Sequence, residues 1–191
     1  MKKKTSTEKA EALVRGILSH LGENPNREGL KSTPSRVVRS WSELFKGYRM
    51  NPKDVLGTTF EKGHYDQMVI CRGIEMYSTC EHHMIPFHGS VDIGYIPGKR
   101  VVGLSKLARL VEVFSRRLQI QEQMTDQICH SLHEHLKPRG VMVVVRAKHL
   151  CMCARGVGKQ NSEMVTSSIL GLFKTSITAR EEFLALTVKI R

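Results

Sequence analysis

A strand–loop–strand unit is predicted by residues 67–96, whose sequence is QMVICRGIEMYSTCEHHMIPFHGSVDIGYI. The segments Gln67–Ser78 and Gly89–Ile96 have the apolar and β-branched content of strands. The loop between them contains the run Cys80-Glu81-His82-His83. One thiol and two imidazoles are therefore expected to lie together at the end of a strand pair.

Three residues have the spacing of a zinc site. Cys80 and His83 lie on one tight loop, and the run His149-Leu150-Cys151 lies far downstream. Thiolates and imidazoles are ligands that zinc prefers. Cys80, His83 and Cys151 with an open fourth position would form a catalytic site, where the metal lowers the pKa of its bound water to about 7. One interpretation of the chain is therefore hydrolytic zinc chemistry.

A further cysteine makes a closed site an equal alternative. If residues 149–153 are extended, His149, Cys151 and Cys153 share one face, because the side chains of a strand alternate. Adding Cys153 to the three ligands would give a closed Cys3His structural site with no position for substrate. The spacing supports the open and the closed site equally, and the same residues without a metal are the third interpretation.

Two histidines lie beside the predicted ligands. His82 adjoins His83, and His149 is two residues from Cys151. A positioned general acid or base contributes about 10²–10⁴ in rate, and histidine suits this role near neutral pH. We interpret His82 and His149 as proton-transfer groups. The histidines on the predicted helix that follows are interpreted as surface residues; they are His130, His133 and His135.

The remainder of the main domain alternates between helices and strands. The turn Pro138-Arg139-Gly140 breaks the second helix, and the β-branched run that follows predicts a strand. The predicted order is β-β-α-α-β-β, which is an α+β pattern and not a parallel doubly wound sheet. The predicted elements are helices over 105–117 and 121–136, strands over 141–153 and 164–173, and a helix over 178–186.

The first 50 residues predict a helical arm. Residues 7–21 have apolar side chains at helical spacing, with Thr5 and Glu8 as a capping box and Gly22 as the stop. A second helix is predicted with Thr33 as N-cap and Pro34 as its first residue, ending near Gly47. Two short helices bury little alone, so the arm is expected to pack on another subunit or on the main domain. Residues 51–64 are interpreted as a connecting loop, and 51–191 as the catalytic domain.

Composition limits the partners. Thirty Lys and Arg residues against 18 Asp and Glu residues give a formal charge of +12, which favours nucleic acid, anionic lipid or phosphorylated small molecules. Aromatic residues make up only 6% of the chain, and no aromatic-basic stacking pattern occurs, which argues against binding of single strands. The five cysteines are an odd number, so a disulfide framework is not expected.

The cell compartment is expected to be the cytoplasm. No apolar stretch reaches the roughly 20 residues that span a bilayer. Met1-Lys2-Lys3-Lys4 has the charge of a signal peptide, but the polar residues 5–11 follow it in place of an apolar segment. Thiolates that bind metal also indicate a reducing compartment. We therefore expect no membrane and no nucleic-acid partner.

Cationic side chains gather at one predicted helix start. Ser105, Lys106 and Arg109 project from one face near an N-terminus, whose unpaired N–H groups favour phosphate. Arg155 and Arg36 are further candidates for the same anion. No P-loop motif occurs. Gln121 and Glu122 begin the next helix, and the Glu122 carboxylate can accept two parallel N–H bonds of the kind that guanine offers.

These motifs, in this order, resemble the GTP cyclohydrolase I family over about residues 8 to 188. The resemblance rests on several separate motifs in register, of which no single one is as specific. They are Ser78-Thr79-Cys80-Glu81-His82-His83, Gly103-Leu104-Ser105-Lys106, Gln119-Ile120-Gln121-Glu122, His149-Leu150-Cys151, Ala154-Arg155-Gly156, Gly171-Leu172-Phe173-Lys174, Glu182-Phe183-Leu184 and Thr33-Pro34-x-Arg36.

The resemblance implies a tunnelling fold, in which subunits pair their sheets into a barrel, commonly as a decamer with active sites at subunit interfaces. It implies conversion of GTP and water to 7,8-dihydroneopterin triphosphate and formate, a step of pterin biosynthesis. No regulatory partner protein is identified. A cysteine at position 153 departs from the family pattern.

The resemblance also implies roles for individual residues. Zn²⁺ is expected on Cys80, His83 and Cys151, with water in the fourth position. His149 is expected to protonate the guanine ring and His82 to assist later proton transfers. The residues expected to bind GTP are Glu122 and Gln121 at the base, and Ser105, Lys106, Arg109, Arg155 and Arg36 at the triphosphate.

One rival function belongs to another class. A basic zinc module with the closed Cys3His site would bind nucleic acid through the positive charge, and its affinity would fall with salt. The two interpretations differ in the coordination of the metal, since the rival predicts three sulfurs and one nitrogen. A zinc nucleobase deaminase is disfavoured, because the His-x-Glu and Pro-Cys-x-x-Cys motifs are absent.

Overall fold

The structure is a computed structural model that describes residues 5–187 of the 191. The lysines of the first four residues lie outside the described part. The chain divides into two compact units, Met1–Lys46 and Gly47–Arg191. Within the described residues, none of the helices combines the length and the apolar character needed to cross a membrane.

The first unit consists of helices, as predicted. Helix α1 (Ser6–His20) begins with the expected capping box, in which the Thr5 hydroxyl accepts from Glu8 N and the Glu8 carboxylate accepts from Thr5 N. Gly22 follows the end of α1 in the left-handed region, with φ of +83°. Val14 is the buried residue of α1.

The second predicted helix is confirmed, but its cap is displaced by one residue. Helix α3 (Thr33–Leu44) has Ser32 and not Thr33 as its N-cap. A further short helix, α2 (Glu28–Lys31), was not predicted. It positions Ser32 at the junction of two helices, and Ser32 makes no side-chain capping bond there.

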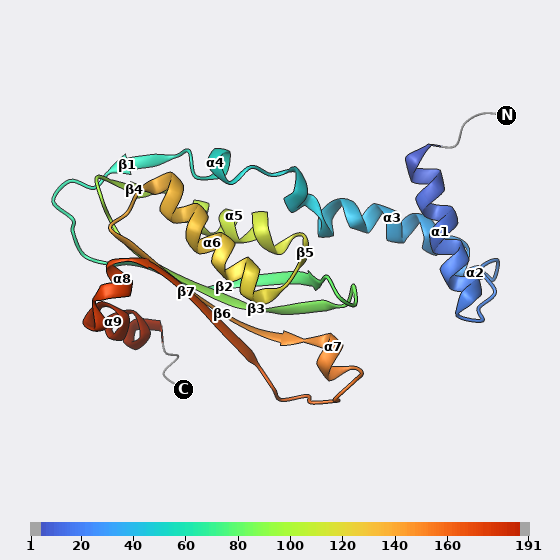
Figure 1. Ribbon diagram of the computed structural model, residues 1–191. Helices are drawn as coiled ribbons and strands as arrows, with labels where there is room; N and C mark the ends of the chain where they lie inside the picture. The colour runs from blue at the N-terminus through green and yellow to red at the C-terminus, as the bar shows by residue number, and fades with distance from the viewer. Residues whose placement is uncertain (1–4, 188–191) are drawn as a thin grey trace. The chain divides into compact units, whose positions relative to one another are not determined.

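The second unit is an α+β structure built on a five-stranded sheet (Figure 1). The strand order is β5-β2-β3-β6-β7, antiparallel throughout except for the parallel β5. A separate two-stranded ladder pairs β1 with β4. The strands are β1 (Thr59–Glu61), β2 (Val69–Cys80), β3 (Pro86–Ile96), β4 (Arg100–Val102), β5 (Leu118–Gln119), β6 (Gly140–His149) and β7 (Met164–Gly171).

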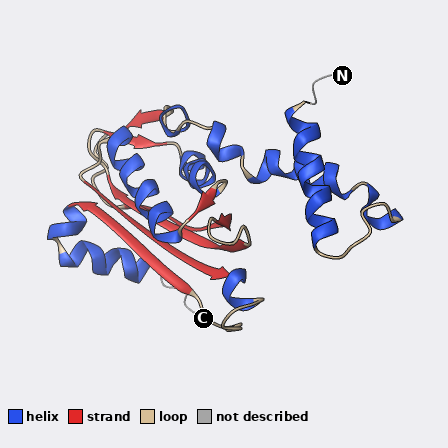
Figure 2. Cartoon of the chain, turned by 45° about the vertical axis from the view of Figure 1, so that its right-hand side comes forward, coloured by secondary structure: helices blue, strands red, loops and turns tan. Residues whose placement is uncertain are grey.

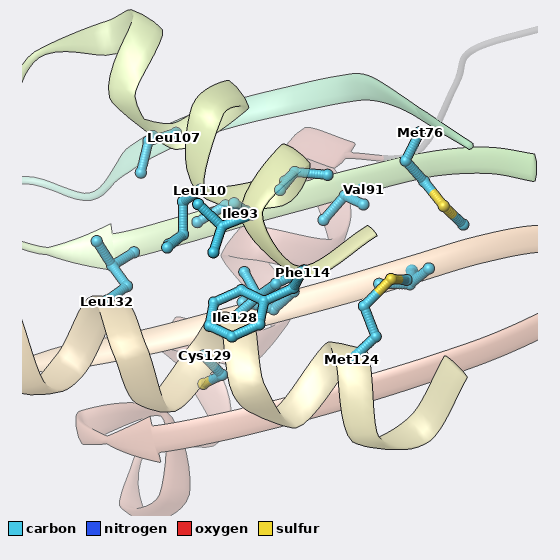
Figure 3. Packing of buried hydrophobic residues seen from close by; sticks show 14 of the residues in the cluster. Met76, Val91, Ile93, Leu107, Leu110, Phe114, Met124, Ile128, Cys129 and Leu132 are labelled. Carbon is cyan, nitrogen blue, oxygen red and sulfur yellow. The ribbon is translucent and has the colours of Figure 1, made fainter. Parts of the chain in front are cut away.

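Two long helices, α5 (Leu104–Ser115) and α6 (Gln121–Leu136), cover one face of the sheet (Figure 2). The main core lies between them and the strands, where Val91 and Ile93 of the sheet meet Leu110, Ile128 and other helix residues (Figure 3). Short helices complete the unit: η1 (Lys46–Arg49) begins at the unit boundary, followed by α4 (Pro52–Val55), α7 (Leu150–Cys153), α8 (Leu172–Thr175) and α9 (Ile177–Thr187).

A second, smaller core lies on the other face of the sheet. Met142 and Val144 of β6 pack there with Phe173 of α8 and Phe183 of α9. The two phenylalanine rings meet edge to face, with centroids 6.2 Å apart. Both faces of β6 are thus buried near its start, which explains its continuous run of apolar residues.

Two predictions of secondary structure were wrong. Residues 51–64 are not a plain loop, because they contain α4 and β1. The strand predicted over 141–153 ends at His149, and Leu150–Cys153 form a helical turn closed by Ala154 N donating to Leu150 O. Strands β4 and β5, with three and two residues, were not predicted because they are too short to show a period.

We predict that Gly89→Ala destabilises this sheet. Gly89 pairs with Ala147 across β3 and β6, and a Cβ at Gly89 would overlap the Arg146 carbonyl and lie 2.7 Å from the Ala147 Cα. The strands must separate to admit a methyl group, and overpacking of this kind costs about 1–3 kcal/mol. The free energy of unfolding in denaturant measures the effect.

Gly16→Ala serves as the control, because a Cβ at Gly16 has no neighbour within 4 Å and the residue lies inside α1. This substitution is expected to be neutral or stabilising. Equal stability of the Gly89→Ala variant and the unaltered protein would contradict the close approach of β3 and β6.

Candidate metal centre

The side chains of Cys80, His83 and Cys151 converge at one end of the sheet. Their ligand atoms all lie within 4.8 Å of one another, and the Cys80 Sγ is 3.7 Å from the His83 Nδ1. Tetrahedral zinc with bonds of about 2.3 Å to sulfur and about 2.0 Å to nitrogen separates its ligands by roughly 3.5–3.8 Å. The donor set and its spacing therefore fit zinc.

A tight turn brings His83 back toward Cys80. Cys80 ends β2, and the turn is closed by Met84 N donating to Cys80 O at 2.8 Å and Cys80 N donating to Ile85 O at 2.9 Å. Met84 adopts the left-handed region, with φ of 54°, which is uncommon for a residue with a side chain. The backbone of this turn therefore fixes the position of His83 relative to Cys80.

Cys151 reaches the site from β6. His149 pairs with Phe87 at the start of β3, and the first turn of α7 then places the Cys151 thiol beside that of Cys80. Burial raises the pKa of the Cys151 thiol, and the neighbouring Cys80 raises it further. A bound cation would reverse this shift, because a thiol that coordinates a metal is deprotonated.

Cys153 does not join the three ligands. Its Sγ donates to the Lys159 carbonyl oxygen at 3.3 Å, and its side chain is buried. The closed site required residues 149–153 to be extended, whereas 150–153 are helical. Two positions along a helix turn the side chain by about 200°, so Cys151 and Cys153 point in different directions.

The structure brings both spare histidines next to the ligands. The His149 ring stacks on Phe87 with centroids 4.5 Å apart, and its Nε2 lies 2.8 Å from the Gln121 Oε1. Burial lowers the pKa of His149, and the nearby Glu122 carboxylate opposes this shift. His82 is exposed and meets the His83 ring edge-on at 6.2 Å.

Two further predicted residues also lie here. The Arg155 Nη1 donates to the His83 Nε2 at 3.3 Å, so a guanidinium stands beside the three ligands. Gln121 is 1% exposed, and its side-chain amide contacts protein groups on β6 and β7 as well as His149. A mostly apolar cavity of about 280 Å³ adjoins His149, and Met152 and Met164 line part of it.

The start of α5 lies at the end of the sheet that is far from the metal ligands (Figure 1). Val102 N, just before α5, donates to the Tyr95 hydroxyl, and Tyr95 pairs with Val69. Cys80 is eleven residues beyond Val69 on β2, which corresponds to about 35 Å at about 3.3 Å per residue. Within one chain, the structure therefore separates the metal ligands from the predicted phosphate residues Ser105, Lys106 and Arg109. Arg36 is exposed on α3, in the first unit.

The stacking of Phe87 on His149 and the left-handed Met84 were not found from the sequence. A phenylalanine at the start of a strand and a methionine in a loop have no distinctive pattern. The only available signal was position, because Met84 directly follows the ligand His83 and Phe87 stands four residues beyond it.

The fold is a mainly antiparallel sheet with two helices on one face. At one end of the sheet lies a Cys2His group flanked by two histidines. These features are typical of a metal-dependent enzyme of the α+β class. Comparison with known proteins identifies the family. The sequence profile described as GTP cyclohydrolase I matches residues 10–188. The chain belongs to the GTP cyclohydrolase I family, whose tunnelling fold was the predicted fold.

Three relatives show the extent of the similarity, and each bears the name GTP cyclohydrolase 1. The protein from Wolinella succinogenes is 58% identical over 91% of this chain and 93% of its own length. Those from Leptospira biflexa and Mycobacterium bovis are 52% and 50% identical, over 92% and 95% of this chain and 96% and 91% of their own lengths. The chain is thus a hydrolase of a zinc-dependent family, and the predicted Zn²⁺ agrees with the three ligands.

Proposed function

We propose that this protein hydrolyses GTP at C8 of the guanine ring, releases formate and forms 7,8-dihydroneopterin triphosphate. The observation that carries the proposal is the convergence of Cys80, His83 and Cys151 with His149 beside them. Zinc, when bound to the three ligands, supplies the activation of a water molecule as nucleophile. The relatives named GTP cyclohydrolase 1 support the same substrate and reaction.

The histidines move protons in this proposal. Protonation of the guanine N7 makes C8 electrophilic, and His149, at the side of the metal group, is the proton donor. His82 is exposed next to His83 and assists the later transfers, including ribose opening in the rearrangement that precedes ring closure. The stacking on Phe87 and the hydrogen bond to Gln121 hold one donor in place, whereas His82 is exposed.

Glu122 binds the base. Its carboxylate is exposed at the start of α6 and interacts electrostatically with His149, so the base and the proton donor meet at one place. A carboxylate accepts the guanine N1–H and N2 amino groups through two parallel bonds. Gln121, the preceding residue, was also expected at the base, but its side chain faces protein groups, so in this proposal it supports the site and does not bind GTP through its amide.

Arg155 serves the triphosphate in this proposal, although it contacts His83 in the structure. The guanidinium has only donors, so its contact with the His83 Nε2 requires that nitrogen to be unprotonated. If the His83 Nδ1 held the metal, its Nε2 would carry the proton and would repel the guanidinium. Arg155 would then be available to an anionic substrate. Arg36, exposed on α3, is proposed as a further phosphate ligand.

The remaining phosphate residues come from a second subunit. Ser105, Lys106 and Arg109 lie at the far end of the sheet from the metal ligands of their own chain. One substrate cannot bridge about 35 Å, so a complete site requires the α5 start of a neighbouring copy. We propose a homo-oligomer, a decamer of barrel-forming sheets, with active sites at its interfaces. The outer strand β7 and the residues 1–50 that form the arm are the proposed contact elements, and 51–191 is the catalytic domain.

We propose the cytoplasm as the location. All five cysteines are free thiols, and two of them are the proposed zinc ligands. A reducing compartment keeps such thiols available.

Subunit mixing tests the shared site. Cys151→Ala and Lys106→Ala are each expected to be inactive alone, because each lacks one half of the site. Co-expression restores activity, since about one quarter of the interfaces in a random mixture combine an intact metal group with an intact cationic group. The formate release per subunit is the measurement. A mixture as inactive as its components would place both halves of the site within one chain.

The reaction itself is tested by incubating the zinc-loaded protein with GTP. Formate and, after oxidation, a fluorescent neopterin are expected in equal amounts. GTP that remains intact, with neither product formed, would overturn the proposed function.

A further inference from the structure

A buried amide connects His149 to three elements of the fold. Gln121 begins α6 and is 1% exposed. Its Nε2 lies 3.2 Å from the Val145 carbonyl oxygen of β6 and 3.0 Å from the Met164 carbonyl oxygen of β7. Its Oε1 lies 2.8 Å from the His149 Nε2. The side chain therefore spans the space between the helix, the two strands and the ring.

The orientation of this amide follows from its partners. Val145 O and Met164 O are carbonyl oxygens, which only accept hydrogen bonds, so the end of Gln121 that faces them must be the NH₂ group. The opposite end, which faces His149, is then the oxygen. An amide rotated by 180° would direct Oε1 at two carbonyl oxygens, with no proton between these acceptors.

Two threonines complete the network and are consistent with this orientation. Thr125 Oγ1 lies 2.7 Å from the main-chain carbonyl oxygen of Gln121, so Thr125 donates its proton there. Thr166 Oγ1, 2.7 Å from Thr125 Oγ1, must then be the donor in that pair. The Thr166 oxygen is left as an acceptor for the Gln121 Nε2 at 3.1 Å. The two protons of the Gln121 NH₂ group thus face three acceptors, which are all oxygen atoms, and the oxygen of the amide is left for His149.

We infer that Gln121 is a positioning residue that holds His149 in a single tautomer, with the proton on Nε2. Because the Gln121 Oε1 can only accept, the His149 Nε2 must donate. The other ring nitrogen, Nδ1, is then the one without a proton in the neutral ring. The inference rests on the proposed function for its consequence, since His149 is the proposed proton donor to the base.

Stacking on Phe87 fixes the plane of the His149 ring. The two rings are nearly parallel, with an interplanar angle of 4°. The hydrogen bond defines which edge of the imidazole faces Gln121, and the stacking defines the plane in which it lies. Together they determine the position of Nδ1 before substrate arrives, as preorganised catalysis requires.

Nitrogen NMR of the zinc-loaded protein tests the tautomer directly. With ¹⁵N-labelled histidine, the His149 signals are identified by their loss in a His149→Gln variant. We expect Nε2 to have the shift of a protonated nitrogen and Nδ1 that of an unprotonated one at a pH where the ring is neutral. A protonated Nδ1, or an equal mixture of the two forms, would overturn the inference without any substitution at Gln121.

A variant then links the tautomer to catalysis. Gln121→Met preserves length and removes the acceptor, so the two tautomers of His149 become mixed and kcat falls on the order of 10²-fold. KM is expected to change little, because the Gln121 side chain faces protein groups. A single Nε2-protonated form with full kcat in this variant would show that Gln121 does not position the ring.

Cys129→Ala is the matched control for loss of stability. Cys129 lies on the same helix, is fully buried, and contacts the Ser168 carbonyl oxygen on β7, but it has no contact with His149. It is expected to lower stability while the tautomer and kcat remain as in the unaltered protein. Failure of GTP turnover in the unaltered protein would refute the proposed function, whereas the NMR result tests the tautomer independently.

Discussion

Cys151→Ala is expected to remove both the bound zinc and the activity. The variant leaves only Cys80 and His83 at the site, and two ligands do not hold zinc against dilution. Without the metal, the pKa of the reacting water is not lowered to about 7, so formate release should fall more than about 10³-fold. Zinc content by elemental analysis and formate release are the two measurements.

Cys153→Ala is the matched control, since Cys153 is a buried thiol in the same helical turn that donates to Lys159 O and does not face the metal ligands. Zinc content and turnover should both persist. X-ray absorption of the unaltered protein should show two sulfurs, one nitrogen and one oxygen. Three sulfurs, or loss of zinc from the Cys153→Ala variant, would restore the closed Cys3His site and remove the place of the reacting water.

The metal ligands could be predicted from the sequence because their signal is chemical and partly local. Cys80 and His83 lie on one turn, and their residue types alone favour zinc. The choice between an open and a closed site depended instead on the backbone at Leu150–Cys153. The run of β-branched residues at 141–145 predicted a strand that continued through it, and a four-residue helix is too short to interrupt the pattern.

The role of Gln121 could not be predicted, because its partners come from three elements. Val145, Met164 and His149 are more than 20 residues from it in the sequence, and a glutamine at a helix start has an ordinary appearance. Only the register of β6 against β7 places two carbonyl oxygens at one end of the amide. The orientation of a buried polar group is thus a property of tertiary packing.

For the cationic residues, the sequence predicted their common helix start but not their distance from the metal ligands. Ser105, Lys106 and Arg109 were predicted on one helix start, and α5 begins there. Their separation from Cys80 follows from the length of β2 and from the contact between Val102 and Tyr95, neither of which the motif contains. A list of site residues from sequence does not state how many chains supply them.

His149→Asn should lower kcat by about 10²–10⁴-fold, the contribution of a positioned general acid, while zinc content stays unchanged. Asparagine does not titrate, so the proton donor is lost, and its shorter amide does not reach the Gln121 Oε1 from the position of the ring Nε2. The metal ligands are other residues, which is why zinc should remain. Stopped assays measure kcat, and chromatography detects any ring-opened formamide that accumulates.

The variant His82→Asn tests a role of His82 in proton transfer, and His130→Asn is its control. If His82 acts in the later transfers, its variant should also be slow, and comparison of formamide accumulation with His149→Asn shows which step each residue serves. His130 lies exposed on α6 beside Asp126, so its variant should have full activity. Turnover at the normal rate in both His82→Asn and His149→Asn would leave neither histidine a role in proton transfer, because no proton donor that the reaction depends on can be lost without a change in rate.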